Sequence, residues 1–318
     1  MWKTRNLAAI AILTIAILGA FVIYKTPSAA APAKSKRRTM IAAYVGNEPP
    51  ELLKFERWLG RPVDGHQVHT ASNNWADWES TIPWEIDLWK NIDRPIFWSI
   101  PLIAKEGTLS DAAAGKYNDH YRNAARILAA ASSKRPKIYI RTGWEFNAEW
   151  MPWNALEGRG HDYAEAYRQF VTSFRAESNK FLFEWTPNVG DRGMDPAEAY
   201  PGDRYVDVIG MDFYWHLQWD PKDPVEAWKE KVGQKYGLQW LEDFAAKHHK
   251  PTAYAEWGVM SDDAGPYVRL AAQWFANHDV VYQSYWNSNA DFRGKLSDDQ
   301  YKKVGAIYRA QFGPAAKR

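Results

Sequence analysis

The chain has 318 residues, of which 46% are hydrophobic and 25% are charged, so it has the composition of a globular protein with a sizeable core. Its formal net charge of +2 is set by the ends: without residues 1–38 and 317–318, 31 basic residues face 38 acidic ones. An acidic body argues against nucleic acid as a partner, and the absence of cysteine excludes disulfides, thiolate metal sites and a cysteine nucleophile.

The chain begins with a segment that is typical of export. Lys3 and Arg5 precede an apolar run over residues 7–23, and small residues follow over 27–33. This order predicts a signal peptide, but the run is also close to the length of a membrane span. We therefore expect an extracytoplasmic protein, either secreted or periplasmic after cleavage, or anchored to the inner membrane by residues 7–23. In this interpretation residues 1–38 are the signal or anchor with a basic linker.

Residues 39–314 alternate between strand-like and helix-like segments. Eight short runs rich in β-branched and aromatic residues predict strands at 40–45, 63–68, 96–100, 137–142, 181–186, 206–212, 252–256 and 280–286. Helical patterns lie between several of them, at 117–131, 163–177, 225–247 and 266–276. Eight strands alternating with helices predict a single-domain α/β fold, a closed (β/α)₈ barrel, followed by a short tail at 315–318.

Two glutamates stand where predicted strands end. Glu145 follows the strand at 137–142, Glu256 ends the strand at 252–256, and both have tryptophan neighbours in a chain with 18 Trp, 17 Tyr and 13 Phe. Functional side chains of such barrels gather at the carboxyl ends of the strands. Two carboxyl groups among aromatic rings suit cleavage of a glycosidic bond, which needs an acid, a nucleophile or base, and flat surfaces for sugar rings. The alternative is that both are ordinary charges at strand ends.

Residues at the other strand ends are expected to join them. These are Tyr44, Gly46, His66 or His69, Trp98, Arg141, Asp212, Tyr214 and Trp286. Candidate platforms for sugar rings are Trp150, Trp153, Trp215, Trp219 and Trp286, with core packing as the alternative for each. We also expect Arg141 to lie beneath Glu256 and keep it ionised, and Glu145, beside Trp144 and Trp150, to have a raised pKa.

We predict no cofactor and no metal site. His66 and His69 are three residues apart, so on one strand they face opposite sides and cannot easily share a metal ion. The sequence has no G-x-S-x-G, P-loop or G-x-G-x-x-G motif, which removes the usual signs of a hydrolase serine or a nucleotide site.

Three segments resemble glycoside hydrolase family 26, whose members include β-mannanases and related endo-β-glycanases. They are residues 141–153, which hold Glu145 and a W-x-P-W tail, residues 200–214, and residues 256–258. The resemblance implies a retaining endo-β-glycoside hydrolase in which Glu256 is the nucleophile and Glu145 the acid, then the base. It also implies that Tyr214 donates a hydrogen bond to the nucleophile.

The chain departs from the family pattern beside the acid. The family usually has His directly before this glutamate and Asn-Gly after it, whereas this chain has Trp144 before it and Asn147-Ala148 after the next residue. The substrate thus stays open among β-mannan, β-glucan, xylan and an exopolysaccharide of the same cell. Asn147 holds either a sugar hydroxyl or the neighbouring loop, and Asp212 contacts substrate or organises its own loop.

Two other classes of function fit the same residues. One is a non-catalytic barrel that binds polysaccharide on its tryptophans; the other is an inverting hydrolase or a transglycosylase. In every case we expect a monomer whose partner is a polysaccharide.

Overall fold

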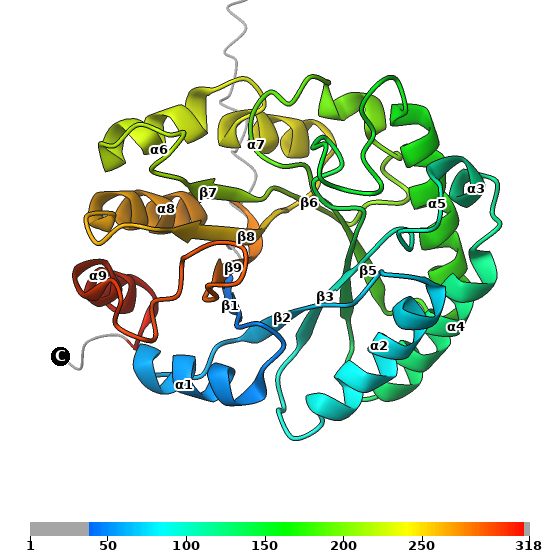
Figure 1. Ribbon diagram of the computed structural model, residues 1–318, viewed down its shortest axis with the longest axis horizontal. Helices are drawn as coiled ribbons and strands as arrows, with labels where there is room; N and C mark the ends of the chain where they lie inside the picture. The colour runs from blue at the N-terminus through cyan, green and yellow to red at the C-terminus, as the bar shows by residue number, and fades with distance from the viewer. Residues whose placement is uncertain (1–37, 315–318) are drawn as a thin grey trace, which may run out of the picture. The chain divides into compact units, whose positions relative to one another are not determined.

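The computed structural model describes residues 38–314, so the predicted signal or anchor at 7–23 and the tail at 315–318 lie outside the described residues. Within that range nine strands form one parallel sheet, in the order β6-β5-β4-β3-β2-β1-β9-β8-β7. An additional pairing of β6 with β8 closes the sheet into a barrel (Figure 1). The strands are β1 Met40–Tyr44, β2 Gly65–His69, β3 Ile96–Ile100, β4 Ile138–Thr142, β5 Phe181–Trp185, β6 Val208–Gly210, β7 Phe213–Trp215, β8 Thr252–Val259 and β9 Val280–Trp286.

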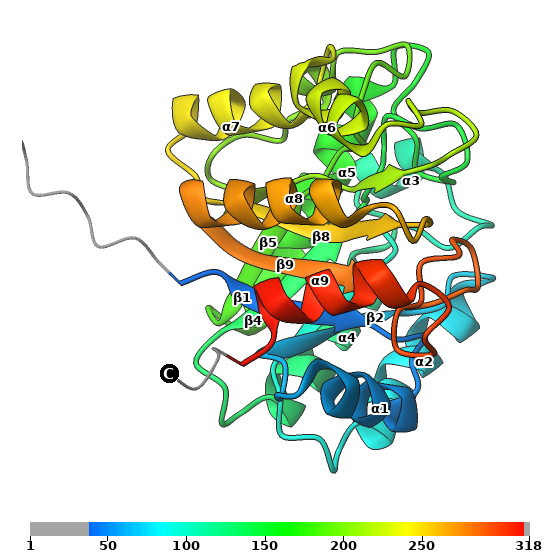
Figure 2. The ribbon, with the colours of Figure 1, turned by 90° about the vertical axis from the view of Figure 1, so that its left-hand side faces the viewer.

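Helices form an outer layer around this barrel (Figures 1 and 2). They are α1 Pro49–Leu59, α2 Trp75–Leu88, α3 Leu109–Ala113, α4 Asn118–Ala131, α5 Gly160–Glu177, α6 Pro224–Gly233, α7 Leu238–Lys247, α8 Gly265–Asn277 and α9 Lys302–Phe312, with a short 3₁₀ turn η1 at Pro196–Ala199. The predicted (β/α)₈ fold is confirmed. Among residues 38–314, no helix combines the length and the apolar character that crossing a bilayer requires.

Two predicted elements differ in the structure. The strand expected at 206–212 is shorter, because β6 covers only Val208–Gly210, and a further strand, β7, begins at Phe213 after Met211 and Asp212. The helix expected at 225–247 is α6 and α7, because Tyr236 takes a positive φ of 56° and Gly237 caps the second helix. A continuous helix is not compatible with that backbone.

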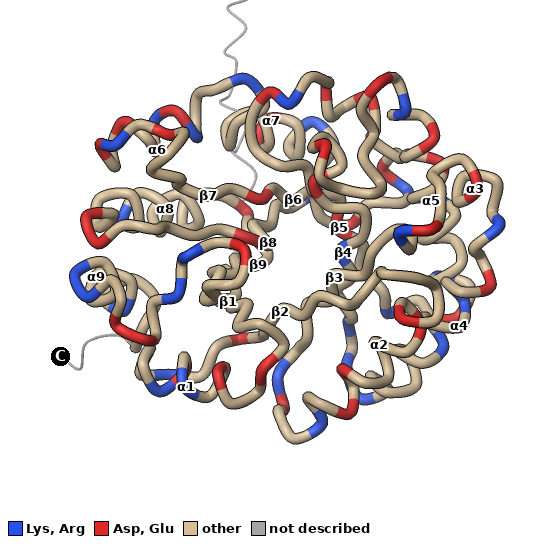
Figure 3. The backbone as a smooth tube through the Cα atoms, in the orientation of Figure 1, with Lys and Arg blue, Asp and Glu red and all other residues tan. Residues whose placement is uncertain are grey.

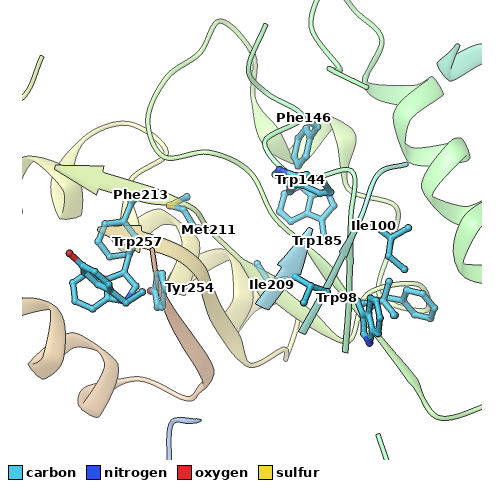
Figure 4. Close-up of a cluster of buried hydrophobic side chains, with 14 of the residues drawn as sticks. Trp98, Ile100, Trp144, Phe146, Trp185, Ile209, Met211, Phe213, Tyr254 and Trp257 are labelled. Carbon is cyan, nitrogen blue, oxygen red and sulfur yellow. The ribbon is translucent and has the colours of Figure 1, made fainter. Parts of the chain in front are cut away.

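The apolar side chains form two separate cores. The larger one fills the space between strands and helices, and Figure 4 shows a part of it in which Trp144, Phe146 and Trp185 lie together. The smaller one fills the inside of the barrel with Ala42, Phe97, Val208, Ala253, Ala255, Val281 and Tyr282. Because successive strand residues point to opposite faces, Phe97 faces the inside while Trp98 faces the helices.

A local irregularity in β8 changes which of its residues face inward. Ala253 and Ala255 belong to the inner core, whereas Tyr254 and Trp257 belong to the outer one. Strict alternation would therefore send Glu256 outward, but the pairing of β8 with β9 shifts its register between Tyr254 and Trp257. Such a bulge adds one residue to a strand, so the side chains beyond it change face. Glu256 thereby points into the barrel.

Charged residues lie mainly on the outer helices and loops, where both signs are mixed (Figure 3). A few lie inside the barrel, where Arg141 pairs with Asp212 and Glu256, because a buried charge needs a partner.

Candidate active site

Glu256 is held at three points inside the barrel. Arg141, from β4, donates to Oε1, and Tyr214, from β7, donates to Oε2 at 2.7 Å. His69 Nε2, at the end of β2, lies 3.4 Å from Oε1. These three contacts fix the orientation of the carboxylate and leave it at the inner wall of the barrel, 6% exposed.

Glu145 stands on a strained turn that follows β4. Gly143 has a φ of 60° and Glu145 itself has a φ of 50°, a conformation that is rare for residues other than glycine. An added Cβ at Gly143 would lie 2.9 Å from the ring of Tyr163, whose hydroxyl donates to the Gly143 carbonyl at 2.7 Å. This close packing, together with the bond from the Glu145 N–H to the Thr186 carbonyl, keeps the turn in place.

The carboxyl group of Glu145 accepts two hydrogen bonds. Trp150 Nε1 donates to Oε2 at 2.7 Å, and Asn188 Nδ2 donates to Oε1 at 2.5 Å. Asn188 follows β5, and its backbone N–H and carbonyl are both bound by the side-chain amide of Asn147 at 2.8 Å. Asn147 therefore holds the neighbouring loop, which was one of its two predicted roles.

Arg141 is the cation at the centre of the barrel. It binds both oxygens of Asp212 at 2.7 and 2.8 Å, donates to Glu256, and reaches Ser99 through Nε at 3.1 Å. All of these groups are buried. Another buried carboxyl group, that of Glu184 in β5, accepts hydrogen bonds from Thr186 and Tyr282. Burial raises the pKa of Glu184. A single guanidinium cannot neutralise every buried carboxyl here, so protonation must do the rest.

The two glutamates have pKa values displaced in opposite directions. Burial, and then repulsion from Glu256, raises the pKa of Glu145 to about 7. Burial also opposes ionisation of Glu256, but the charge of Arg141, with the hydrogen bond from Tyr214, outweighs it and lowers the pKa of this carboxyl. Burial lowers the pKa of His69 to about 4, so its ring is neutral at pH 7. One carboxyl thus keeps its proton near neutral pH while the other is ionised.

Both carboxyl groups line one pocket of about 730 Å³ at the carboxyl ends of the strands. Its wall includes His69, Trp144, Glu145, Trp150, Met151, Asn188, Val189, Arg192, Tyr214, His216, Trp219, Asp220, Lys231, Glu256, Trp286, Asp291 and Phe292. Trp150 and Trp219 are 51% and 71% exposed at its rim. A pocket that combines exposed indole rings with two carboxyl groups of different protonation is suited to hold a sugar chain at its cleavage point.

Most of the predicted site residues lie in the pocket or directly behind it. Glu145, Glu256, Trp144, Trp150, Tyr214 and Trp286 line the pocket. Arg141, Asn147 and Asp212 lie behind it and hold the lining residues. Asp212 thus organises the site through Arg141, and Trp286 forms a nearly buried wall against Tyr44, with ring centroids 4.1 Å apart.

Three expected site residues lie elsewhere, and these expectations are corrected. His66 faces the helices and packs on Trp89, with ring centroids 4.0 Å apart, so His69 is the histidine of the site. Trp98 also faces the helix layer. Trp153 is buried, and its Nε1 donates to the Trp144 carbonyl, which makes it a support of the turn.

Two further expectations change as well. Of the two tryptophans near β7, Trp219 lines the pocket, while Trp215 is buried against Tyr267 with ring centroids 5.6 Å apart. Glu256 lies within β8, which continues to Val259, and does not end the strand as we expected.

The sequence reasoning missed several pocket residues. Asn188 and Arg192 follow β5, and their position after a predicted strand was the available signal. His216, Asp220 and Lys231 form one group near β7, in which Lys231 binds Asp220 at 2.7 Å. Within the described residues, no three His, Cys, Asp or Glu side chains gather closely enough to hold a metal ion.

A (β/α)₈ barrel whose pocket holds one glutamate with a raised pKa and one with a lowered pKa has the arrangement of a glycoside hydrolase. Comparison with known proteins points to a particular family: a profile of Glycosyl hydrolase family 26 matches residues 111–234. This match includes Glu145, Asn188, Asp212 and Tyr214. The resemblance to family 26 seen in the sequence motifs is therefore confirmed.

Two curated relatives match part of the chain. A mannan endo-1,4-beta-mannosidase of Bifidobacterium adolescentis is 28% identical over 159 residues, which cover 46% of this chain and 16% of the relative. Endoglucanase H of Acetivibrio thermocellus is 29% identical over 205 residues, which cover 58% of this chain and 21% of the relative. The chain thus spans about a fifth or less of the length of the relatives that it matches.

Solved structures share the fold. The crystal structure of the YdhT protein from Bacillus subtilis has a TM-score of 0.63 at 16% identity, and the match covers 88% of this chain and 87% of that one. At this identity the likeness concerns the fold alone.

Proposed function

We propose that the protein is a retaining, endo-acting β-glycoside hydrolase, with Glu145 as acid and base and Glu256 as nucleophile. The observation that carries the proposal is the placement of both carboxyl groups in one pocket, with pKa values displaced in the directions that these roles require. A general acid must hold a proton at the working pH, and a nucleophile must be ionised.

In the first step the Glu145 carboxyl gives its proton to the glycosidic oxygen while a Glu256 oxygen attacks the anomeric carbon. The bond to the leaving sugar breaks, its electrons remain on the protonated oxygen, and an ester joins the remaining sugar to Glu256. Tyr214 and Arg141, each bound to one oxygen of Glu256, orient the carboxylate for this attack.

In the second step Glu145, now ionised, takes a proton from water as the water oxygen attacks the anomeric carbon. The ester bond to Glu256 breaks, and both glutamates return to their starting states. Trp150 and Asn188 donate to Glu145 throughout, so they stabilise its ionised form between the two steps.

The proposed substrate is a β-linked polysaccharide, with β-mannan, β-glucan and an exopolysaccharide as the candidates. Support comes from the names of the relatives, one a mannosidase that acts on mannan and one an endoglucanase, and from the exposed indole rings of Trp150 and Trp219. We further propose that the protein is exported through its apolar N-terminal segment at residues 7–23.

The test uses the full-length protein on a panel of β-mannans, β-glucans, xylans and bacterial exopolysaccharides, with the release of reducing ends as the measure. Glu145→Gln should lower the rate by a factor of about 10²–10⁴, the usual contribution of acid–base catalysis. Glu149→Gln, in the same turn but exposed and outside the pocket, is the matched control and should keep full activity.

The stereochemistry of the product gives a second test. Proton NMR of the first product formed should show the β-anomer, because two displacements restore the starting configuration. An α-anomer would make the enzyme inverting. If folded protein releases no sugar from any substrate of the panel, the hydrolase proposal fails and a binding function takes its place.

A further inference from the structure

A second hollow adjoins the proposed catalytic pocket. It measures about 520 Å³ and lies between the loops that follow β1 and β2 and one face of α2. It is lined by Asn47, His69, Thr70, Ala71, Asp77, Ser80, Thr81 and Trp84. His69 lines both the hollow and the catalytic pocket, so the two depressions meet at this residue.

The face of α2 that lines the hollow carries one large exposed ring. Asp77, Ser80, Thr81 and Trp84 are spaced by three, four and seven residues, which places them on one side of the helix. Trp84 is 53% exposed there, whereas Trp78 of the same helix is fully buried. An indole face next to hydroxyl and carboxyl groups has the two elements that bind a sugar ring, a flat apolar surface and hydrogen-bonding partners.

The walls of the hollow are fixed by contacts within the protein. The Asn47 amide binds the backbone of His69 on both sides, donating to its carbonyl at 2.9 Å and accepting from its N–H at 3.3 Å. The hydroxyl groups of Ser80 and Thr81 donate to the Asp77 carbonyl. Their oxygen lone pairs stay available as acceptors, and the walls need little rearrangement to receive a ligand.

We propose that this hollow is a distal sugar-binding subsite with Trp84 as its platform, which extends the substrate path from the two glutamates past His69. The inference rests on the proposed function, and it narrows the substrate class to chains long enough to reach both depressions. Short oligosaccharides that occupy only the catalytic pocket do not touch Trp84.

The experiment compares oligosaccharides of increasing length, prepared from the polysaccharide that the full-length protein cleaves best. Trp84→Ala should lower kcat/KM about tenfold for long chains, the loss expected for one stacked sugar ring, and leave the shortest cleavable chain unchanged. Leu53→Ala on α1, which also removes an exposed apolar side chain, is the matched control for every length. An equal loss for all lengths, or no loss for any, would overturn the subsite.

A binding measurement separates this inference from the proposed function. In gels that contain dissolved polysaccharide, the catalytically dead Glu256→Gln protein should migrate slowly, and the double variant with Trp84→Ala should migrate faster. If the wild-type protein cleaves no substrate, the proposed hydrolase function is refuted, whereas the difference in migration between the two proteins still tests the subsite. Equal migration of the two proteins would contradict it.

A separate observation concerns Arg192, which contacts both hydrogen-bond donors of Glu145. Its Nη2 donates to Asn188 Oδ1 at 3.0 Å, and its guanidinium lies over the Trp150 ring, 5.1 Å from the centroid. Because Oδ1 of Asn188 is engaged by Arg192, the amide must present its Nδ2 to Glu145. The geometry points to Arg192 as a positioning residue that selects this orientation of the Asn188 amide.

The charged and titratable groups around Glu145 come from several elements. They are Glu256 of β8, Arg141 of β4, Asp212 between β6 and β7, and Tyr214 of β7. None of them contacts the Asn188 amide in the bonds that the structure shows for the described residues, so Arg192 acts on that amide separately. Without Arg192 the amide is free to turn and accept a hydrogen bond from protonated Glu145.

The test is the pH dependence of kcat/KM for Arg192→Met and Arg192→Lys. Loss of the fixed amide orientation should move the alkaline limb of the pH profile to higher pH in Arg192→Met. Arg192→Lys keeps the charge but lacks the planar guanidinium group, so it should return the limb only partly to its wild-type position. Arg122→Met, at an exposed ion pair on α4, is the control. Should a variant be inactive but folded, NMR titration of ¹³C-labelled Glu145 replaces the rate. A titration that coincides with that of the wild-type protein would overturn the role of Arg192.

Discussion

Replacing Trp150 by phenylalanine should shift the proton affinity of Glu145. The substitution keeps an aromatic ring at the pocket rim and removes only the N–H that donates to Oε2 at 2.7 Å. This bond favours the ionised carboxylate over the neutral acid, because hydrogen bonds to charged groups are the stronger ones. A difference of about 1 kcal/mol between the two states, divided by 1.36 kcal/mol per pKa unit, gives a rise of about 0.5–1 unit.

The assay is kcat/KM between about pH 4 and pH 10. In the proposed mechanism Glu145 must be protonated, so activity should be lost as the pH rises through its pKa, which burial and repulsion raise to about 7. In Trp150→Phe this alkaline limb should move upward by the calculated amount. Trp219→Phe is the matched control, since Trp219 is also exposed in the pocket but makes no bond to Glu145 among those that the described residues show. A limb that stays in place or moves to lower pH in Trp150→Phe would refute the reasoning.

Three other outcomes follow from contacts in the barrel. Arg141→Met leaves two buried carboxylates without their cation, so the free energy of unfolding in urea should fall by about 3–5 kcal/mol; a loss below about 1 kcal/mol, the usual value for an exposed pair, would contradict this. Gly143→Ala should cost at least about 1 kcal/mol more than Gly193→Ala, because both glycines have positive φ but only the first would collide with Tyr163; equal midpoints in thermal denaturation would speak against the clash. Glu256→Gln removes the repulsion on Glu145 while its burial remains, so NMR titration should show a lower pKa for Glu145, and a value of 7 or above would disprove the coupling.

The sequence allowed the barrel to be predicted because its signals are local. Each strand is a short β-branched or aromatic run, and the helices predicted at 117–131, 163–177 and 266–276 have their own periodicity, so these elements followed without tertiary information, whereas α1, α2, α3 and α9 were not predicted. The early end of the strand predicted at 206–212 and the break in the helix predicted at 225–247 could not be predicted from the sequence. Asp212, which follows β6, pairs with Arg141, a residue 71 positions earlier, and no local pattern contains that contact.

Whether a strand residue points into the barrel or toward the helices was harder to predict than the elements themselves. Strands of a parallel barrel are buried on both faces, so His66 and His69, or Trp98 and its neighbours, give no hydrophobic contrast that shows which face points inward. The same limit applies to the tryptophans after β4. Trp150 and Trp153 are three residues apart, and only the packing of the turn exposes the first and buries the second.

The irregular register of β8 has a practical consequence for anyone who aligns or redesigns this chain. Deleting the one residue between Tyr254 and Glu256 would leave composition, hydropathy and strand length almost unchanged, yet Glu256, the proposed nucleophile, would point toward the helices, and the pocket would lose one of its two glutamates. A single gap placed there in a sequence alignment would likewise assign Glu256 to the wrong face of the strand.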